Sequence, residues 1–179
     1  IMKAECDDLN DVFFHYITTG LPYVVMKYAM TMDGKIATYT GESKWISNEM
    51  SRVRVQETRN KLTGIMVGIG TVLEDNPMLT CRLENGRNPI RIICDTKLRI
   101  SVDCNIVKTA KDISTIVATS IESDVDKIKM LEALGVKIIQ VNTLDGHVDL
   151  NELMKKLGEM NIDSILLEGG GTLNESALS

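Results

Sequence analysis

Short apolar runs alternate along this chain with longer segments in which apolar residues recur at helical spacing. Runs of this length, rich in β-branched residues and bounded by turn-forming residues, are typical of strands that are buried on both faces. The pattern predicts strands at residues 23–30, 64–69, 89–94, 114–119, 136–141 and 163–167.

The longer segments predict helices at residues 8–17, 48–62, 124–134 and 149–160. Their ends carry capping residues that fix where each helix begins and stops. We expect Ser47 to cap the second helix, Gly64 to stop it, and Gly135 to end the third. The sequence Thr19-Gly20-Leu21-Pro22 breaks the first helix and separates it from the rest of the chain.

Strands that alternate with helices indicate an α/β domain with a mostly parallel central sheet and helices on both faces. Ligands of such sheets bind in the loops beyond the carboxyl ends of the strands. The most polar or glycine-rich loops, at 31–44, 70–82 and 168–172, each follow a predicted strand. These loops are therefore where we expect the chemistry.

Composition limits the possible classes of protein. The 179 residues suffice for one domain with a core, and 44% hydrophobic and 25% charged residues are ordinary for a soluble globular protein. We expect a cytoplasmic protein with no membrane partner, because no apolar run has the length of a membrane span and the first residues do not resemble a secretion signal. We expect no metal, since the cysteines form no CxxC pair and His15 and His147 lie far apart.

The net charge of −5 argues against a nucleic-acid partner, which usually meets a basic face. It leaves room for a phosphorylated ligand, because a few well-placed arginines can dominate a local field. Arg59, late on the second predicted helix, and Arg82, just after the turn at Asp75-Asn76-Pro77, are candidates. Each taken alone has the alternative interpretation of a solvated surface charge.

The sequence Glu168-Gly169-Gly170-Gly171-Thr172 predicts a strand-to-helix turn. Glycines let backbone N–H groups approach a diphosphate closely, and a helix N-terminus favours negative charge. The sequence is neither a GxGxxG fingerprint nor a P-loop, and a flexible turn is an equally good interpretation. Trp45, the single tryptophan, is suited to stacking on a heterocycle or to anchoring a core or hinge.

Four motifs occur in a fixed order: KYAMTMDGKIA at 27–37, GESKWI at 41–46, VGIGTVLEDNP at 67–77 and LEGGG at 167–171. From about Pro22 to its end, the chain closely resembles the C-terminal reductase domain of the bifunctional bacterial riboflavin-biosynthesis deaminase–reductase. The resemblance implies a dihydrofolate-reductase-like α/β fold. It also implies that the domain uses NADPH to reduce 5-amino-6-(5-phosphoribosylamino)uracil to the ribitylamino product.

The resemblance assigns roles to individual positions. Those that match the NADPH site are Ala29, Trp45, Thr71, Asp75, Thr96 and the turn and helix start at Gly170, Gly171, Thr172, Leu173, Asn174, Glu175 and Ser176. Those that match the substrate site are Ser43, Arg59, Leu79, Arg82 and Glu168. A basic stretch at 95–99 follows a predicted strand and is placed to meet the 2′-phosphate that distinguishes NADPH from NADH.

The resemblance also suggests how the substrate is held. We expect Arg59 and Arg82 to bind its phosphate, whose oxygens match the guanidinium fork, and Ser43 and Glu168 to hold the pyrimidine. Lys27 and Glu168 are the catalytic candidates, as a pair across adjacent strands. A purely structural ion pair at the same place is the alternative.

The chain departs from the bifunctional family in two respects. It has neither the H-x-E nor the P-C-x-x-C motif of the zinc deaminase half, so we expect it to bind no zinc and to release no ammonia. Residues 1–21 resemble the linker at the end of that half, and residues 22–179 the reductase domain. The sequence ends soon after Gly171, where the family continues with further strands, so we expect those strands to be missing. The deaminase domain of the same polypeptide and a second copy in a homodimer are the expected partners.

Three alternatives remain at this stage. A related reductase that acts on the 2,5-diaminopyrimidinone precursor would use the same residues, and only substrate preference separates the two. A non-catalytic nucleotide-binding module is disfavoured, and NADPH binding would test it. The residues that argue against it are Lys27, Asp33, Arg59, Asp75, Arg82 and Glu168. A dihydrofolate reductase is disfavoured because the arginine pair suits a phosphate.

Overall fold

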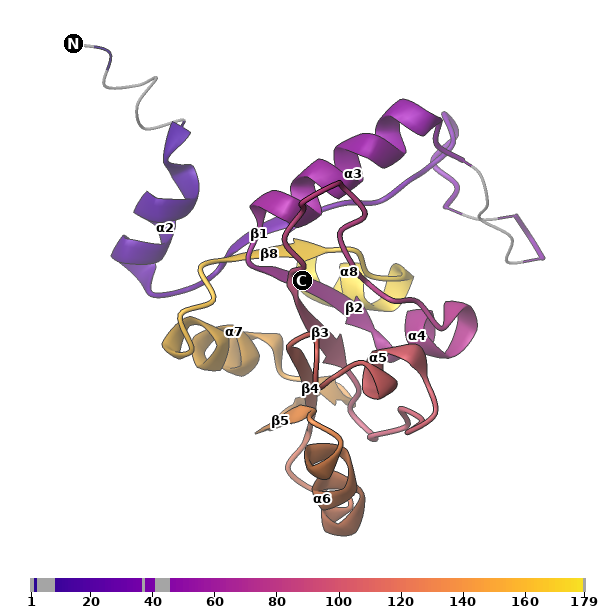
Figure 1. Cartoon of the computed structure of the whole chain (residues 1–179), viewed down its shortest axis with the longest axis vertical. Helices are drawn as coiled ribbons and strands as arrows, with labels where there is room; N and C mark the ends of the chain where they lie inside the picture. Colours follow the sequence, from indigo (N-terminus) through magenta and orange to yellow (C-terminus); the bar gives the residue numbers. More distant parts are fainter. Residues whose placement is uncertain (1, 3–8, 37, 41–45, 179) are drawn as a thin grey trace.

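The computed structural model describes residues 2, 9–36, 38–40 and 46–178, and it contains a sheet with helices on both faces (Figure 1). In chain order the elements are α2 (Asp11–Thr19), β1 (Tyr23–Met26), α3 (Glu49–Lys61), β2 (Gly64–Gly68), α4 (Ile69–Asp75), β3 (Ile90–Cys94), α5 (Asn105–Lys108), β4 (Thr115–Ser120), α6 (Val125–Ala133), β5 (Lys137–Val141), β6 (Thr143–Leu144), β7 (His147–Val148), α7 (Leu150–Glu159), β8 (Ser164–Leu167) and α8 (Gly171–Leu178). Among these residues, no helix combines the length and apolarity needed to cross a membrane.

The central sheet has six strands in the order β1-β8-β2-β3-β4-β5, and all neighbouring pairs are parallel. The prediction of a mostly parallel α/β sheet is confirmed. β8 comes late in the chain but lies between β1 and β2, where Leu167 is in register with both Met26 and Met66. The carboxyl ends of these three strands therefore meet, and the glycine-rich turn after β8 lies beside the start of α4.

Two apolar clusters fill the space between sheet and helices. One joins the sheet to α4, α5 and α6 through residues such as Val72, Ile106 and Leu131. The other joins it to α7 and α8 through Leu153 and Leu173. Strands β2, β3, β4 and β5 contribute to both clusters by alternation, so they appear in the sequence as nearly continuous apolar runs.

Several predicted boundaries are wrong. β1 ends at Met26 rather than at residue 30, because its neighbour β8 ends at Leu167 and leaves no backbone partner beyond Lys27. Helix α3 begins after Asn48, whose side chain accepts a hydrogen bond from Ser51 N, so Ser47 is not the cap. Gly64 does not stop this helix but opens β2, where a Cβ would lie 3.0 Å from Ile92 Cδ1 of the next strand.

Part of the predicted loop 70–82 is helical. Helix α4 follows β2 directly and buries Ile69 and Val72 against the sheet, and it ends at Asn76 in the left-handed region. Gly70 and the Asp75-Asn76-Pro77 sequence suggested a loop, but two buried apolar residues three apart supply enough packing for a short helix.

Helix α2, inside the predicted linker 1–21, contacts both β1 and the end of α7. The Tyr16 hydroxyl donates to the carbonyl of Gly158 at 2.9 Å, and Gly20, with φ 69°, caps the helix. A Cβ at Gly158 would lie 2.0 Å from the carbonyl oxygen of Gly20, so only glycine allows α7 to approach this closely. The assignment of 1–21 as a linker stays a prediction.

Arg91 is a fully buried charge without a carboxylate partner. Its guanidinium donates to the hydroxyls of Thr115 and Thr109 and to the carbonyls of Met78, Ile106 and Ile113, at distances from 2.6 to 3.3 Å. Burial lowers the pKa of Arg91 to about 10, which still leaves it charged at neutral pH. Arg91 therefore ties three segments to the middle of the sheet.

Candidate functional site

A pocket of about 370 Å³ opens at the carboxyl ends of β2 and β3. The turn after β3, the β6–β7 hairpin and the first turns of α8 form its other walls. We call it the cationic pocket, and its lining residues are Gly68, Ile69, Gly70, Cys94, Thr96, Lys97, Arg99, Gly146, His147, Val148, Leu150, Leu173 and Ser176.

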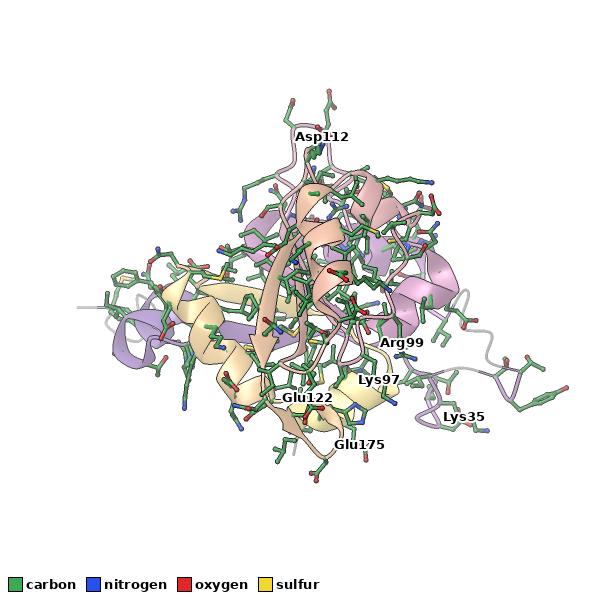
Figure 2. The ribbon with its side chains drawn as sticks, turned by 90° about the horizontal axis from the view of Figure 1, so that it is seen from below. Lys35, Lys97, Arg99, Asp112, Glu122 and Glu175 are labelled. Carbon is green, nitrogen blue, oxygen red and sulfur yellow. The ribbon has the colours of Figure 1, made fainter. Side chains whose placement is uncertain are left out.

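The charges of the cationic pocket are all of one sign. Lys97 and Arg99 line it together with His147, and among the residues that the structure describes no aspartate or glutamate does. Burial raises the pKa of Cys94 to about 12, so this thiol adds no negative charge at neutral pH. Figure 2 shows Lys97 and Arg99 on the same side of the molecule as Glu175 of α8, with Asp112 at the opposite end. The chain has a net charge of −5, so the local charge of this pocket is opposite in sign to that of the protein as a whole.

Asp95 shapes the turn that carries the two basic side chains. It is fully buried, and one carboxylate oxygen accepts a hydrogen bond of 2.8 Å from Ile100 N. The other oxygen lies 3.8 Å from Arg99 Nε, beyond hydrogen-bond distance. The carboxylate therefore faces into the turn and not into the pocket, and it is not placed to accept a bond from a ribose hydroxyl.

The glycine-rich turn joins β8 to α8 at the other wall. A Cβ at Gly169 would lie 2.9 Å from Asn174 Oδ1 and 3.0 Å from Leu173 Cβ, so this glycine is required by close packing. A Cβ at Gly170 would meet nothing nearer than Thr71 Oγ1 at 3.9 Å. The turn thus leaves open space at Gly170, between the starts of α4 and α8, where two helix N-termini lie close together.

Glu168 forms a salt bridge with Arg59 of α3. The contacts are bidentate, with Arg59 Nε at 2.8 Å and Nη2 at 2.9 Å from the two carboxylate oxygens, while Nη1 donates to the Thr80 carbonyl at 2.9 Å. Only 10% of the Arg59 side chain and 12% of the Glu168 side chain are exposed. We call this arrangement the ion-pair site.

The predicted pair between Lys27 and Glu168 is therefore wrong. Lys27 is one residue beyond the end of β1, and its backbone N–H donates to the Leu167 carbonyl. Its ammonium group forms no ion pair within the described residues, because Arg59 reaches Glu168 from α3 and satisfies both carboxylate oxygens. The expected pairing of adjacent strands suggested Lys27 as the partner of Glu168. It contained no information about Arg59, which reaches Glu168 from helix α3.

The other predicted substrate positions have different settings. Leu79 has φ 53°, and its side chain is buried in the core cluster rather than exposed. Arg82 is exposed, its backbone N–H donates to Gln56 Oε1, and its guanidinium forms no ion pair in the described part of the chain. Ser43 lies outside the described residues, as does Trp45.

The predicted cofactor positions are partly gathered in one place. Thr96, Leu173 and Ser176 line the cationic pocket, and Thr71 and Gly170 face each other at its edge. Ala29 is half-buried after β1, and Asp75 is exposed at the end of α4, and neither lines the pocket. Gly171, Thr172, Asn174 and Glu175 belong to the first turns of α8, of which Asn174 packs on Gly169.

The β6–β7 hairpin was missed in the sequence. It pairs Leu144 with His147 through a turn at Asp145 and Gly146, which both have positive φ. Asp-Gly between two short apolar or β-branched segments is a strong hairpin signal, and it marks this position in the sequence. The hairpin places Gly146, His147 and Val148 in the pocket wall.

Comparisons with known proteins agree with this architecture. The family model of the RibD C-terminal domain matches residues 22–179. The riboflavin biosynthesis protein RibD of Actinobacillus pleuropneumoniae is 57% identical over 129 residues, which are 72% of this chain and 34% of that protein. The protein PYRR of Arabidopsis thaliana, described as a chloroplastic riboflavin biosynthesis protein, is 38% identical over 65% of this chain and 19% of its own length. The chain thus spans about a third or less of these relatives.

Two solved structures extend the comparison. A deaminase/5-amino-6-(5-phosphoribosylamino)uracil reductase from Thermotoga maritima superposes with a TM-score of 0.81 at 36% identity, over 99% of this chain and 47% of that one. The riboflavin biosynthesis reductase Rib7 of Saccharomyces cerevisiae superposes with a TM-score of 0.67 at 27% identity, over 94% and 75% of the two chains.

The parallel α/β sheet and its likeness to these two structures define a domain of the dihydrofolate-reductase-like fold class. The chain belongs to the RibD C-terminal domain family. The family predicted from the four ordered motifs is confirmed, and a nicotinamide cofactor is implied for the family in general.

Proposed function

We propose that this chain uses NADPH to reduce the ribose of 5-amino-6-(5-phosphoribosylamino)uracil to the ribityl chain. The observation that carries the proposal is the cationic pocket, which is lined by Lys97, Arg99 and His147 and by no carboxylate, in a chain of net negative charge. A dinucleotide with phosphate groups fits that charge, and the pocket lies where α/β sheets bind such ligands.

Different residues around the pocket suit different parts of the cofactor. Backbone N–H groups at the start of α8 face the open space at Gly170 and suit the diphosphate. Lys97 and Arg99 suit an additional phosphate on the adenosine ribose, and the apolar Ile69, Leu150 and Leu173 suit its base. NADPH supplies a hydride when bound, and the protein supplies position and charge.

The substrate would lie beside the ion-pair site. The net reaction adds a hydride to the sugar carbon that bears the nitrogen and a proton to the ring oxygen that leaves this carbon. Glu168 is held rigidly by Arg59, so its carboxylate has a fixed position from which to accept a hydrogen bond from the pyrimidine. Arg82 has no carboxylate partner in the described residues and suits the substrate phosphate. Lys27, at the end of the neighbouring strand, is kept as a catalytic candidate.

Arg59 takes a different role from the one predicted. Three of its nitrogens already donate to Glu168 and Thr80. It serves substrate binding by fixing Glu168, and the phosphate is left to Arg82. We place Ser43 and Leu79 in the substrate site, and Ala29, Trp45, Thr71 and Asp75 in the cofactor site, on the strength of the family resemblance.

The proposed function extends to partners. The Thermotoga maritima relative is described as both deaminase and reductase, so we propose that a deaminase domain belongs to the same polypeptide here. We further propose a cytoplasmic homodimer, a state that gel filtration with light scattering of the full-length protein would test.

One assay tests the reaction. NADPH oxidation by the full-length protein is followed with the aminouracil ribose phosphate, its diaminopyrimidinone analogue and dihydrofolate in parallel. We expect the highest catalytic efficiency with the aminouracil. A preference for the diaminopyrimidinone would assign the chain to the related reductase, and oxidation with none of the three would refute the proposal.

A further inference from the structure

We propose that His147, on the β6–β7 hairpin, determines cofactor specificity by binding the 2′-phosphate of NADPH together with Lys97 and Arg99. This inference rests on the proposed function, since it assumes that the cationic pocket holds the cofactor. It adds a residue that neither the sequence pattern nor the four motifs suggested, and it gives the hairpin a role.

The hairpin holds His147 in a defined place. Its Asp145-Gly146 turn has positive φ at both central residues, the conformation that fits the twist of a two-residue hairpin. Val148, next to His147, is buried in the core, and its backbone N–H donates to Thr96 Oγ1 at 3.1 Å. Because Thr96 belongs to the same turn as Lys97 and Arg99, this bond fastens the hairpin to the turn that carries the other two cations.

Lys97, Arg99 and His147 come from two segments that are about 50 residues apart in the sequence, yet they line one pocket. A single lysine on a surface needs no ligand to explain it. No carboxylate is among the described lining residues. The buried Asp95 forms a salt bridge of 3.8 Å with Arg99 through Oδ1 and accepts a hydrogen bond from Ile100 N through its other oxygen, so it offsets part of the Arg99 charge. Within the described residues, Lys97 and His147 form no ion pair.

The side chains of Lys97, Arg99 and His147 suit a phosphate monoester better than a diphosphate. A diphosphate within a dinucleotide has no freely ionising second proton, whereas a 2′-monoester carries nearly two negative charges at neutral pH. Three donors from two sides suit that higher charge. A site for the ribose hydroxyl of NADH would instead present a carboxylate, as in the common dinucleotide fold, and no carboxylate lines this pocket.

The experiment compares His147→Gln with the matched variant His15→Gln in the full-length protein. His15 lies on α2, where its ring stacks edge-on against Tyr23 at 5.6 Å, and it lines no part of the pocket. Calorimetry measures binding of adenosine 2′,5′-bisphosphate and of adenosine 5′-monophosphate, which differ only in the 2′-phosphate. KM values are then determined for NADPH and NADH.

We expect His147→Gln to weaken binding of the bisphosphate and to raise the KM for NADPH by roughly threefold to tenfold, the effect of one partly exposed charge-assisted contact. Binding of the monophosphate and the KM for NADH should change less than twofold, and His15→Gln should change neither. An equal loss of affinity for both adenosine ligands would show that the hairpin shapes the adenosine site without contacting the 2′-phosphate. That result would overturn the inference.

Two further outcomes separate this inference from the proposed function. If the unaltered protein prefers the bisphosphate and oxidises NADPH with the aminouracil, but His147→Gln binds as tightly, only the role of His147 is refuted. If the unaltered protein binds neither adenosine ligand and oxidises no nicotinamide cofactor, the proposed function fails first and the inference with it.

Discussion

The cationic pocket and the ion-pair site use positive charge in opposite ways. In the pocket, Lys97 and Arg99 face an open cavity with no carboxylate among its described lining residues. Arg99 is 3.8 Å from the buried Asp95 but keeps 56% of its side chain exposed, so both cations can still contact an anion. In the ion-pair site, the Arg59 guanidinium is bound on three nitrogens by Glu168 and Thr80, and little of it is exposed. An arginine in the cationic pocket can therefore contribute to ligand binding, whereas Arg59 in the ion-pair site fixes the position of Glu168.

The largest effect is expected from breaking the ion-pair site. Arg59→Ala should lower the free energy of unfolding by about 3 kcal/mol or more, because it leaves the buried Glu168 carboxylate without its partner. Urea denaturation measures this change. The double variant Arg59→Ala/Glu168→Gln should recover part of the loss, since it removes the unpaired charge. A loss below 1 kcal/mol in the single variant would mean that Arg59 is not structural.

Arg82 offers the contrast with Arg59 on the substrate side. Arg82→Ala should lower kcat/KM for the phosphorylated substrate roughly tenfold to a hundredfold, the value of one charge-assisted hydrogen bond. Stability and NADPH affinity should barely change, because the side chain is exposed and does not line the pocket. Arg82→Lys should restore activity only in part, since an ammonium group cannot make a bidentate contact. An equal loss with the dephosphorylated substrate would contradict the phosphate role.

The pocket is tested through its cofactor preference. The unaltered protein should prefer NADPH to NADH, and removing Lys97 or Arg99 by substitution with Ala should reduce that preference about tenfold, mainly through the KM for NADPH. Steady-state kinetics with both cofactors gives the ratio. Lys61→Ala, in the last turn of α3, is the control because Lys61 is a basic residue that does not line the pocket. Equal catalytic efficiency with NADH in the unaltered protein would refute the assignment.

The smallest effect concerns two adjacent glycines. Gly169→Ala should cost about 1 kcal/mol of stability, at the low end for overpacking, because the Asn174 and Leu173 side chains can shift by a few tenths of an ångström. Gly170→Ala should leave stability unchanged, since the added methyl group enters open space, but should weaken NADPH binding if this space holds the diphosphate. Thermal denaturation and fluorescence titration distinguish the two variants, and equal loss of stability would contradict this difference.

The sequence predicts the fold better than it predicts the contacts of the site. Strands β2, β3, β4, β5 and β8 of the central sheet follow from their apolar runs, because a strand inside such a sheet buries two faces. The ends of β1 and α3 do not, since they depend on where the neighbouring β8 ends and on which of two adjacent polar residues caps the helix. Local sequence carries no information about either.

The candidate site shows the same limit. The glycine-rich turn and the basic stretch after β3 could be found from residues alone, because their roles depend on local backbone and charge. The partner of Glu168 could not, since Arg59 lies 109 residues away and reaches it from a helix. His147 was set aside as an isolated histidine, although its Asp-Gly turn marks a hairpin.

Arg91 also affects how parts of the protein unfold locally. One guanidinium donates to the carbonyls of Met78, of Ile106 in α5 and of Ile113, so none of these three segments can leave the interior alone without leaving a charged donor unpaired in an apolar environment. Local fluctuations in the three segments are therefore coupled. In native-state hydrogen exchange, protected amides near the three positions should exchange with one shared free energy, as a single cooperative unit that spans about 40 residues of sequence.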